Sequence, residues 1–274
     1  MKTNTLKKLL AICLCLTMAI VFAACSGGGS EDEGGGDEGE TLTIVAVTEA
    51  TYPPFESVDE EGNIVGFDID LIYAIAEDQG FNVEIQNINF DALIPTVESH
   101  QADMIIAGIS ENPERAEHVA FTNPYYNSGN FLMVMADSDI NSEADIPTDA
   151  KIGAQTGTTC ADYAQAFVAD GKAAEVVILD QTTTMVLQLE NGDIQVIVGD
   201  KPVLDEYVAK SGGKYKLAGP FSYETGDGML KMAVAKDNPE LLEKLNTGLA
   251  NIMANGKYQE ICDKWGIGGL DTAE

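Results

Sequence analysis

Arginine is almost absent from this chain of 274 residues, where Arg115 stands alone against fourteen lysines. Lysine suffices wherever a positive charge is merely solvated. A lone arginine therefore indicates a need for the planar guanidinium, which can hold a carboxylate through two parallel hydrogen bonds. Asn112 and Pro113 favour a helix start beside it, where free N–H groups attract anions. We predict a carboxylate-binding corner at Arg115; a surface or ion-pairing arginine is the alternative that composition leaves open.

Long hydrophobic runs are also lacking, apart from one at the N-terminus. Three lysines precede an apolar run over residues 9–24, which is shorter than the about 20 residues of a transmembrane helix and typical of a signal peptide. The run ends in FAAC at 22–25, which resembles the lipobox of bacterial lipoproteins, with Phe22 in place of the usual leucine. The resemblance implies cleavage after residue 24 and a lipid on Cys25. An ordinary secretory signal with an incidental cysteine is the alternative.

Residues 25–40 contain only glycine, serine and acidic residues after the cysteine. Such a segment has nothing to bury, and its like charges repel. We expect a disordered tether that reaches about 50 Å when fully stretched. A tether of this kind would let a folded domain move above a membrane to which Cys25 anchors it.

Cysteine and histidine are too sparse to build a metal site. The folded part keeps Cys160 and Cys262, there is no C-x-x-C, and His100 and His118 stand alone. A structural zinc site needs four such ligands. We expect no metal and no cofactor, and we interpret both cysteines as isolated packing thiols.

Positive charge is scarce as well, since 15 Lys and Arg residues face 45 Asp and Glu residues for a net charge of −30. Such a surface repels nucleic acid and anionic lipid headgroups. We expect no nucleic acid partner, and membrane contact through lipid rather than through a basic face.

After residue 41 the apolar periodicity predicts two sets of alternating strands and helices. The first set has strands at 42–47, 83–87 and 104–107, helices at 68–78 and 92–99, and a further helix opening at Asn112. The second set has strands at 151–154, 176–179 and 195–198 and helices at 161–169 and 183–190. This rhythm predicts two α/β lobes, each a mostly parallel sheet covered on both faces.

Two extended stretches, 123–135 and 221–235, connect the sets, and helices at 239–255 and 257–264 close the chain. We predict that the first lobe comprises 41–125 and 230–274 and that the second comprises 130–225. Hinges would lie near 126–129 and 226–229. A two-segment hinge favours closure of the lobes around a ligand.

Several motifs follow one another in the order known from one family. They are TYPPFE at 51–56, GFDID at 66–70, FDALIP at 90–95, IAGIS at 106–110 with PER at 113–115, FTNPYY at 121–126, QTGTT at 155–159, NGD at 191–193, VGD at 198–200, GKY at 256–258 and DKW at 263–265. Over residues 41–268 the chain is similar to extracytoplasmic solute-binding proteins of polar amino acid ABC importers, family 3 of the bacterial solute-binding proteins.

The resemblance implies a two-lobed periplasmic-binding-protein fold of type II, the flytrap, with two hinge crossings. It implies a monomer that binds an amino acid and delivers it to an ABC transporter permease with its ATPase. The protein would sit lipid-anchored on the outer face of the cytoplasmic membrane, or in the periplasm.

Ligands of open α/β sheets lie beyond the carboxyl ends of the strands, which here means the cleft between the lobes. We expect Arg115 and the Ser110 hydroxyl to hold the ligand α-carboxylate, together with the N–H groups and Thr159 of the loop 155–159. That loop is not a P-loop, because no Gly-Lys-Ser/Thr follows it. Asp200 would accept from the α-ammonium; its alternative role is to cap the helix before Pro202.

Tyr52 and Phe90, each expected in a loop after a strand, would sandwich the ligand side chain; without the resemblance both would be assigned to the core. The resemblance further implies that the Gly108 carbonyl accepts from the ammonium and that Glu49 and Gln155 line the side-chain end. The complete predicted set is Glu49, Tyr52, Phe90, Ala107, Gly108, Ser110, Arg115, Gln155, Thr158, Thr159 and Asp200.

Glu49 favours a polar or cationic ligand, because an aliphatic side chain would desolvate the carboxylate without pairing it. The alternative is that Glu49 turns outward. The same fold also serves a prephenate or arogenate dehydratase and the sensor domains of receptors. Glu49 could act as an acid–base group, but both histidines stand alone. The signal, the lipid cysteine and the absence of a signalling domain favour an uptake receptor, so we expect no enzyme activity.

Overall fold

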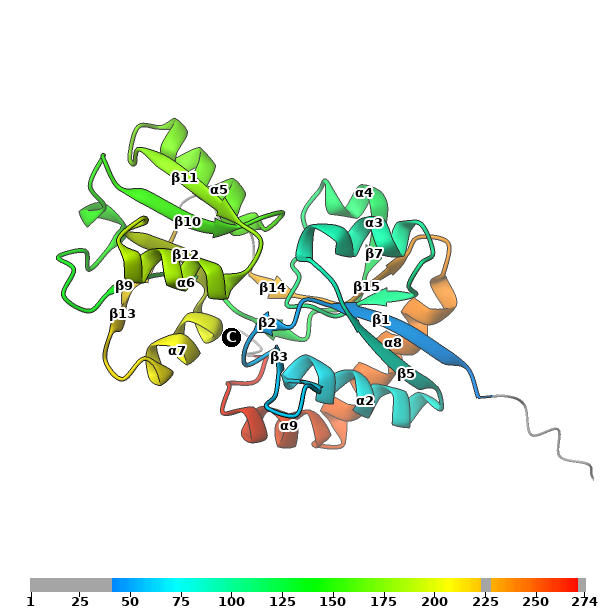
Figure 1. Ribbon diagram of the computed structural model, residues 1–274. Helices are drawn as coiled ribbons and strands as arrows, with labels where there is room; N and C mark the ends of the chain where they lie inside the picture. The colour runs from blue at the N-terminus through cyan, green and yellow to red at the C-terminus, as the bar shows by residue number, and fades with distance from the viewer. Residues whose placement is uncertain (1–40, 223–227, 271–274) are drawn as a thin grey trace, which may run out of the picture. The chain divides into compact units, whose positions relative to one another are not determined.

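The computed structural model describes residues 41–222 and 228–270. The predicted signal peptide, Cys25 and the tether to residue 40 lie outside the described residues. From Thr41 onward the chain forms one compact unit, in which two five-stranded sheets build two lobes (Figure 1). In the described part no helix has the length and apolar character needed to cross a membrane.

The first lobe is built on a mixed sheet in the order β5-β1-β6-β15-β7. The strands are β1 (Thr43–Thr48), β5 (Asn82–Asn87), β6 (Met104–Ile105), β7 (Val119–Phe121) and β15 (Ala233–Ala235). β1 runs parallel to β5 and β6, whereas β15 runs antiparallel to both of its neighbours. The helices are α2 (Phe67–Gln79), α3 (Leu93–Glu98) after the 3-10 turn η1 (Phe90–Ala92), α4 (Arg115–His118), α8 (Pro239–Ala254) and α9 (Lys257–Trp265).

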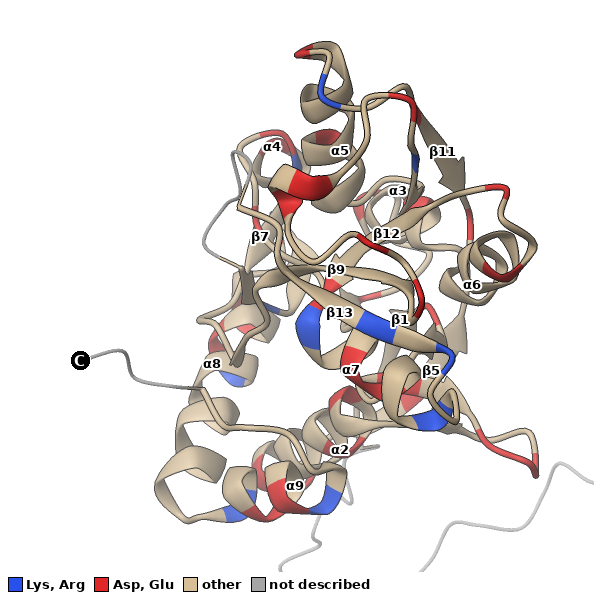
Figure 2. Cartoon of the chain, turned by 90° about the vertical axis from the view of Figure 1, so that its left-hand side faces the viewer, with Lys and Arg blue, Asp and Glu red and all other residues tan. Residues whose placement is uncertain are grey.

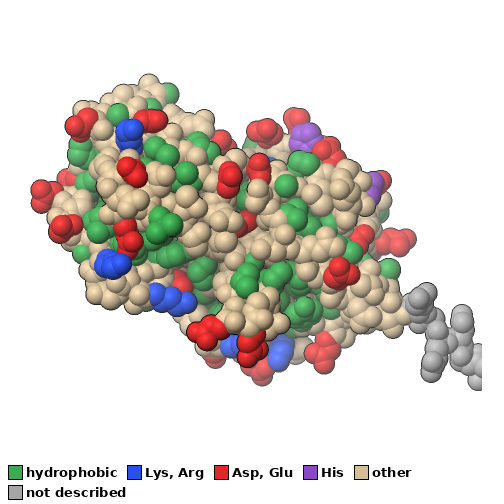
Figure 3. All heavy atoms as spheres, viewed as in Figure 1, with side chains coloured by type: hydrophobic (Ala, Val, Ile, Leu, Met, Phe, Trp, Pro, Cys, Tyr) green, Lys and Arg blue, Asp and Glu red, His purple; other side chains and the backbone are tan. Residues whose placement is uncertain are grey.

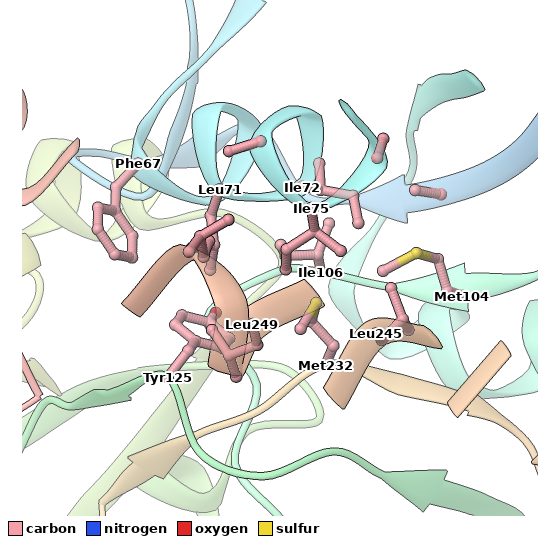
Figure 4. Close-up of a cluster of buried hydrophobic side chains, with 14 of the residues drawn as sticks. Phe67, Leu71, Ile72, Ile75, Met104, Ile106, Tyr125, Met232, Leu245 and Leu249 are labelled. Atoms are coloured by element: carbon pink, nitrogen blue, oxygen red, sulfur yellow. The ribbon is translucent and has the colours of Figure 1, made fainter. Parts of the chain in front are cut away.

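The main core of this lobe lies between α2 and the C-terminal helices. Phe67, Leu71, Ile72 and Ile75 of α2 are all 0% exposed. They pack with Leu245 and Leu249 of α8, with Met104 of β6 and with Ile106 directly after that strand (Figure 4). Burying one such side chain stabilises the fold by roughly 1.5–3 kcal/mol. The opposite face of the sheet is covered by Leu93 and Val97 of α3.

The second lobe repeats the arrangement in the order β11-β10-β12-β9-β13. Its strands are β9 (Asn130–Met135), β10 (Lys151–Gln155), β11 (Glu175–Leu179), β12 (Val196–Asp200) and β13 (Tyr215–Pro220). Its helices are α5 (Thr159–Ala169), α6 (Thr182–Asn191) and α7 (Lys201–Lys210), with a 3-10 turn, η2 (Glu143–Asp145), before β10. Side chains of α5 bury one face of the sheet, and those of α6 and α7 bury the other.

Each sheet has two parallel and two antiparallel strand pairs, so the prediction of mostly parallel sheets is wrong for half of each sheet. The antiparallel half comes from the segments that pass between the lobes. β9 follows the first passage and pairs with β12, while β15 follows the second and pairs with β6. Sequence periodicity reports burial along a strand but not the direction of its partner.

The two passages pair with each other between the lobes. β8 (Tyr126–Asn127) and β14 (Met229–Leu230) form a two-stranded antiparallel sheet, and Ser128 N–H donates to Gly228 O at 2.9 Å. This pairing includes described residues of the predicted hinges near 126–129 and 226–229, of which 226–227 lie outside the described residues. Their action as hinges stays a prediction.

Some short elements differ from the expectations. A three-stranded sheet of β2 (Thr51–Tyr52), β3 (Glu56–Val58) and β4 (Ile64–Val65) was not predicted, and it places Tyr52 in a strand rather than a loop. The helix expected from Asn112 begins at Arg115, because Asn112 is still in the capping turn: its Oδ1 accepts from Arg115 N–H at 2.7 Å. Phe90 lies in η1 rather than in a loop.

Acidic side chains occupy positions on elements of both lobes, and lysines are few between them (Figures 2 and 3). On the face in Figure 3, the basic side chains are scattered among more numerous acidic ones. This distribution agrees with the strongly negative net charge of the chain.

Candidate functional site

A cavity lies between the lobes, and every predicted site residue except Ala107 lines it. Its wall consists of Glu49, Tyr52, Glu56, Phe90, Gly108, Ser110 and Arg115 from the first lobe and Gln155, Thr158, Thr159, Cys160 and Asp200 from the second. Ala107 is 1% exposed and packs in the core beneath α3. The side chain of Ala107 therefore faces the core and does not line the cavity, although Ala107 directly precedes Gly108.

The cavity lies where parallel strands end. Glu49 follows β1, Gly108 comes shortly after β6, and Gln155 and Asp200 are the last residues of β10 and β12. Carboxyl ends of parallel strands meet at one edge of a sheet. The carboxyl ends of the parallel strands of both sheets thus face the cavity, and residues remote in sequence meet there.

Arg115 is buried, at 7% exposed, and its guanidinium is held from three sides. Nη1 donates to Ser110 O at 2.5 Å, and Nη2 donates across the cavity to Gly157 O at 2.8 Å. The Phe90 ring lies against it, with Cζ 5.5 Å from the ring centroid. Both hydrogen-bonded oxygen atoms are neutral carbonyls, and the nearby charges of Asp162 and Asp200 also act on the guanidinium.

Two further contacts form at this corner. The Ser110 carbonyl oxygen accepts from Arg115, while the expected donation from the Ser110 hydroxyl to the ligand carboxylate stays a prediction. The Phe90 ring lies over the guanidinium, and its expected place beside the ligand side chain likewise stays a prediction. Burial lowers the pKa of Arg115, but a guanidinium remains charged at neutral pH all the same.

The N-terminus of α5 faces the same corner from the second lobe. Thr158 caps the helix: its hydroxyl accepts from Ala161 N–H at 3.2 Å and donates to Gln155 O at 2.7 Å. Thr159 and Cys160, the first two residues of α5, line the cavity. The first N–H groups of a helix have no acceptor within it, so they add to the attraction for an anion.

Two acidic side chains line the other part of the cavity. Asp200 Oδ2 accepts from the Tyr52 hydroxyl at 2.8 Å, and Glu49 Oε2 accepts from Gln155 Nε2 at 3.2 Å. Both contacts join the two lobes. Asp200 occupies the N-cap position of α7, as the alternative role required, but its side chain makes no capping hydrogen bond. Glu49 is 3% exposed and does not turn outward.

Burial dominates the protonation of this acidic end. It raises the pKa of Asp200 to about 6, although Tyr52, Ser128 and Arg115 pull in the opposite direction. Burial also raises the pKa of Glu49, against hydrogen bonds from Thr51 and Gln155. A cation placed between them would compensate two desolvated carboxylates.

Two residues that line the cavity are missing from the prediction. Glu56, at the start of β3, is 0% exposed, and it lies within the motif at 51–56 that the sequence already singled out. Cys160 was interpreted as a packing thiol, but it lines the cavity, and its Sγ contacts Asn130 Oδ1 at 3.4 Å. Burial raises the pKa of the Cys160 thiol well above its ordinary value, so it is a poor nucleophile.

A second cavity adjoins the first and extends into the second lobe. The two share Tyr52, Gln155, Thr158 and Cys160, and the second extends towards Met185 and Leu204 of α6 and α7. Within residues 41–222 and 228–270, no group of three His, Cys, Asp or Glu side chains is placed to hold a metal ion.

Comparisons with known proteins agree with this fold. Residues 44–268 match the bacterial extracellular solute-binding proteins, family 3. The ABC transporter arginine-binding protein 1 of Escherichia coli (strain K12) is 37% identical over 220 residues, which cover 79% of this chain and 87% of that protein.

Two solved structures of an ancestral arginine-binding protein are 35% identical to this chain. The one bound to arginine has a TM-score of 0.76 and covers 81% of this chain and 97% of its own. The one bound to glutamine has a TM-score of 0.75, and the match covers 82% of this chain and 98% of that protein. Since the family match extends over most of its length, the chain belongs to the bacterial extracellular solute-binding proteins, family 3.

Proposed function

We propose that this protein binds a cationic or polar L-amino acid in the cavity between its lobes and delivers it to an ABC importer. The observation that carries the proposal is the separation of charge in one buried cavity. Arg115 places a positive charge whose hydrogen bonds go to neutral carbonyls at one end, and Asp200 and Glu49 place two desolvated carboxyls at the other.

An α-amino acid with a cationic side chain matches this pattern group by group. Its carboxylate would lie between Arg115 and the N-terminus of α5. Its ammonium would lie between Asp200 and the Gly108 carbonyl, and its side-chain cation would pair with Glu49. The Tyr52 and Phe90 rings would flank the side chain, which adds a cation–π attraction of about 0.5–2 kcal/mol.

The names of similar proteins support this ligand class. One relative is called an arginine-binding protein, another from Neisseria gonorrhoeae a probable histidine-binding protein, and the ancestral protein was solved with arginine and with glutamine. Arginine is therefore the ligand that we expect to bind most tightly, with lysine, ornithine, histidine and glutamine as competitors.

We also propose that the lobes, 41–125 with 230–274 and 130–225, close on the ligand about the two passages. The hydrogen bonds from Tyr52 to Asp200 and from Arg115 to Gly157 join the two lobes. A bound ligand would lie beside these bonds and add its own contacts to both lobes. Small-angle scattering should give a smaller radius of gyration at ligand saturation. No change would favour a rigid pocket.

The lipid anchor, the monomeric state and the ATPase partner belong to the proposal as well. Cys25→Ser should release the protein from the outer face of the membrane while ligand affinity stays unchanged. Persistent membrane association of this variant would indicate another anchor.

An enzyme of the same fold is the rival, and we propose that the protein is not one. The raised pKa values of Asp200 and Glu49 would suit acid–base chemistry, but the family to which it belongs consists of binding proteins. Incubation with prephenate or arogenate should give no product.

The ligand is tested by a thermal-shift screen over the twenty amino acids, ornithine and cystine, followed by calorimetric titration of the hits. Basic amino acids should give the largest shifts, and glutamine a smaller one. Tight binding of leucine or valine without any response to basic or amide amino acids would overturn the proposal.

A further inference from the structure

Two buried carboxyl groups meet in the first lobe, behind the cavity wall. Glu56 of β3 lines the cavity, and Asp68 in the first turn of α2 lies behind it; both are 0% exposed. Three of their four carboxyl oxygens, both of Glu56 and Oδ1 of Asp68, have no hydrogen-bond donor within the described part of the chain. Three buried oxygen atoms without donors would cost several kcal/mol if both groups were ionised.

The remaining oxygen of Asp68 holds the loop that forms part of the site. Oδ2 accepts from Gly108 N–H at 2.9 Å and from the Tyr125 hydroxyl at 2.7 Å. Gly108 has a φ of 54°, and a Cβ on it would lie 3.1 Å from the Tyr52 ring and 3.9 Å from Glu56 Oε1. Asp68 therefore determines which way the peptide groups of Gly108 point.

One proton on Glu56 satisfies most of the missing bonds. A protonated Glu56 can donate its O–H to the Asp68 side chain, with which it is in hydrogen-bonding contact, and Oδ1 is the oxygen of Asp68 that lacks a donor. Two acceptors then have a partner, and like charges no longer face each other. Only the carbonyl oxygen of Glu56 remains an acceptor towards the cavity.

The surrounding charges favour this protonation. Glu49 after β1, Asp68 on α2 and Asp200 at the end of β12 all raise the pKa of Glu56, in addition to burial, which is the largest cause. Together with burial, these charges hold the pKa of Glu56 well above the ordinary value of a glutamate.

The other polar groups near the pair do not reverse this balance. The Tyr125 phenol donates to Asp68, and this bond lowers the pKa of Asp68, which burial raises to about 6. Tyr52 contributes a neutral phenol from β2 that is already bonded to Asp200. Arg115 on α4 is the cation that lines the same cavity, and its guanidinium donates hydrogen bonds to the carbonyl oxygens of Ser110 and Gly157.

We propose that Glu56 is a neutral carboxylic acid in the folded protein, and that its proton bridges to Asp68 and so fixes Gly108 for the ligand ammonium. Glu56 is in this sense a positioning residue that acts through Asp68. All the residues of the bridge belong to the first lobe, so it does not depend on lobe closure. Only the role of the Gly108 carbonyl rests on the proposed function.

The proton itself is tested by infrared spectroscopy of the ligand-free protein at pH 8. A protonated carboxylic acid has a C=O stretching band that ionised carboxylates lack, and the band should be present in the wild type. It should be lost in Glu56→Gln and kept in Glu60→Gln, a matched change at an exposed glutamate. A wild-type spectrum without the band, or a band that survives in Glu56→Gln, would overturn the proposal.

The positioning role is tested by arginine titrations of two variants. Glu56→Gln imitates the protonated acid, because the new amide can donate to Asp68 and keep a carbonyl towards the cavity, so this variant should bind within about threefold of the wild type. Glu56→Leu removes the donor and should weaken binding about tenfold or more. Equal losses in both variants would contradict the role.

These outcomes separate the inference from the proposed function. If the wild type binds no basic or amide amino acid, the proposed function fails, while the infrared band still decides the protonation of Glu56. If Glu56→Leu does not fold, the band and the Glu56→Gln titration remain decisive.

Discussion

The hydroxyl of Tyr52 donates to Oδ2 of Asp200 at 2.8 Å and joins two residues that are 148 positions apart in the chain. Tyr52 belongs to the small sheet of the first lobe, and Asp200 ends the central strand β12 of the second. The bond orients the carboxylate that we propose as the partner of the ligand ammonium. Tyr52 thus has a polar role besides contributing an aromatic wall.

Ligand affinity should fall below about pH 6, because burial raises the pKa of Asp200 to about 6 and the ligand ammonium requires the ionised form. Binding then releases a proton, and the affinity for arginine should drop by up to about tenfold per pH unit below that value. Calorimetric titration between pH 5 and 8 measures this slope. Asp200→Asn should bind arginine weakly over the whole pH range, and its affinity should not show the pH dependence that comes from Asp200. A wild type whose affinity is flat over the range would argue against the assignment.

Arg115→Lys should lose most of the affinity while the fold stays intact. Lysine keeps the charge but not the fork that spans Ser110 O and Gly157 O. Breaking a desolvated bidentate pair costs about 2–5 kcal/mol, or about 30- to several-thousand-fold in affinity. The thermal unfolding midpoint of the ligand-free variant serves as the control for folding. Near-normal affinity in a titration would rule out the carboxylate clamp.

Glu49→Gln should change the preference between ligands. The variant loses the charge that we pair with a cationic side chain, so arginine should bind about tenfold or more weakly, and glutamine should change only slightly. The ratio of the two dissociation constants is the quantity to measure. Glu77→Gln, at an exposed position of α2, controls for the loss of one negative charge. An unchanged ratio would place the side-chain cation elsewhere.

Gly66→Ala should be strongly destabilising. A Cβ at Gly66 would lie 1.9 Å from the backbone oxygen of Phe55, so β3 would have to move away from the start of α2. We expect a loss of about 3 kcal/mol or more in the free energy of unfolding. Gly62→Ala is the control for the cost of a positive φ alone, since nothing lies within 4 Å of a Cβ at that position. This variant should lose about 1–2 kcal/mol in the free energy of unfolding. Equal losses in urea unfolding would contradict the steric argument.

The ligand-free protein should be more stable at pH 5 than at pH 8. Asp68 and Asp200 have pKa values of about 6 when folded, above the ordinary 3.8, so the folded state binds their protons more tightly. Their contribution is complete below 3.8 and is lost as the pH rises to about 6, at roughly 1.4 kcal/mol per pKa unit for each group. Unfolding midpoints across this range test the sign, and Asp68→Asn should flatten the curve. A midpoint that rises towards pH 8 would contradict it.

Much of the fold follows from local pattern. The predicted strands and helices lie within a few residues of the observed ones, because apolar side chains at a period of two or 3.6 select the face that each element buries. Arg115 and Asp200 stand out for reasons that are also local, namely a unique guanidinium and an acidic residue at a strand end. The order of the motifs indicates the family, and with it most of the residues around the cavity.

The tertiary structure alone decides which distant groups meet. It inserts β15 beside β6, sets the Tyr52 hydroxyl on Asp200 and turns Ala107 into the core while Gly108 faces the cavity. It also brings Glu56 against Asp68, where the sequence shows only two acids in adjacent motifs. Periodicity records whether a residue is buried, whereas the protonation of a buried acid depends on its neighbours in space, and packing between remote segments chooses those neighbours.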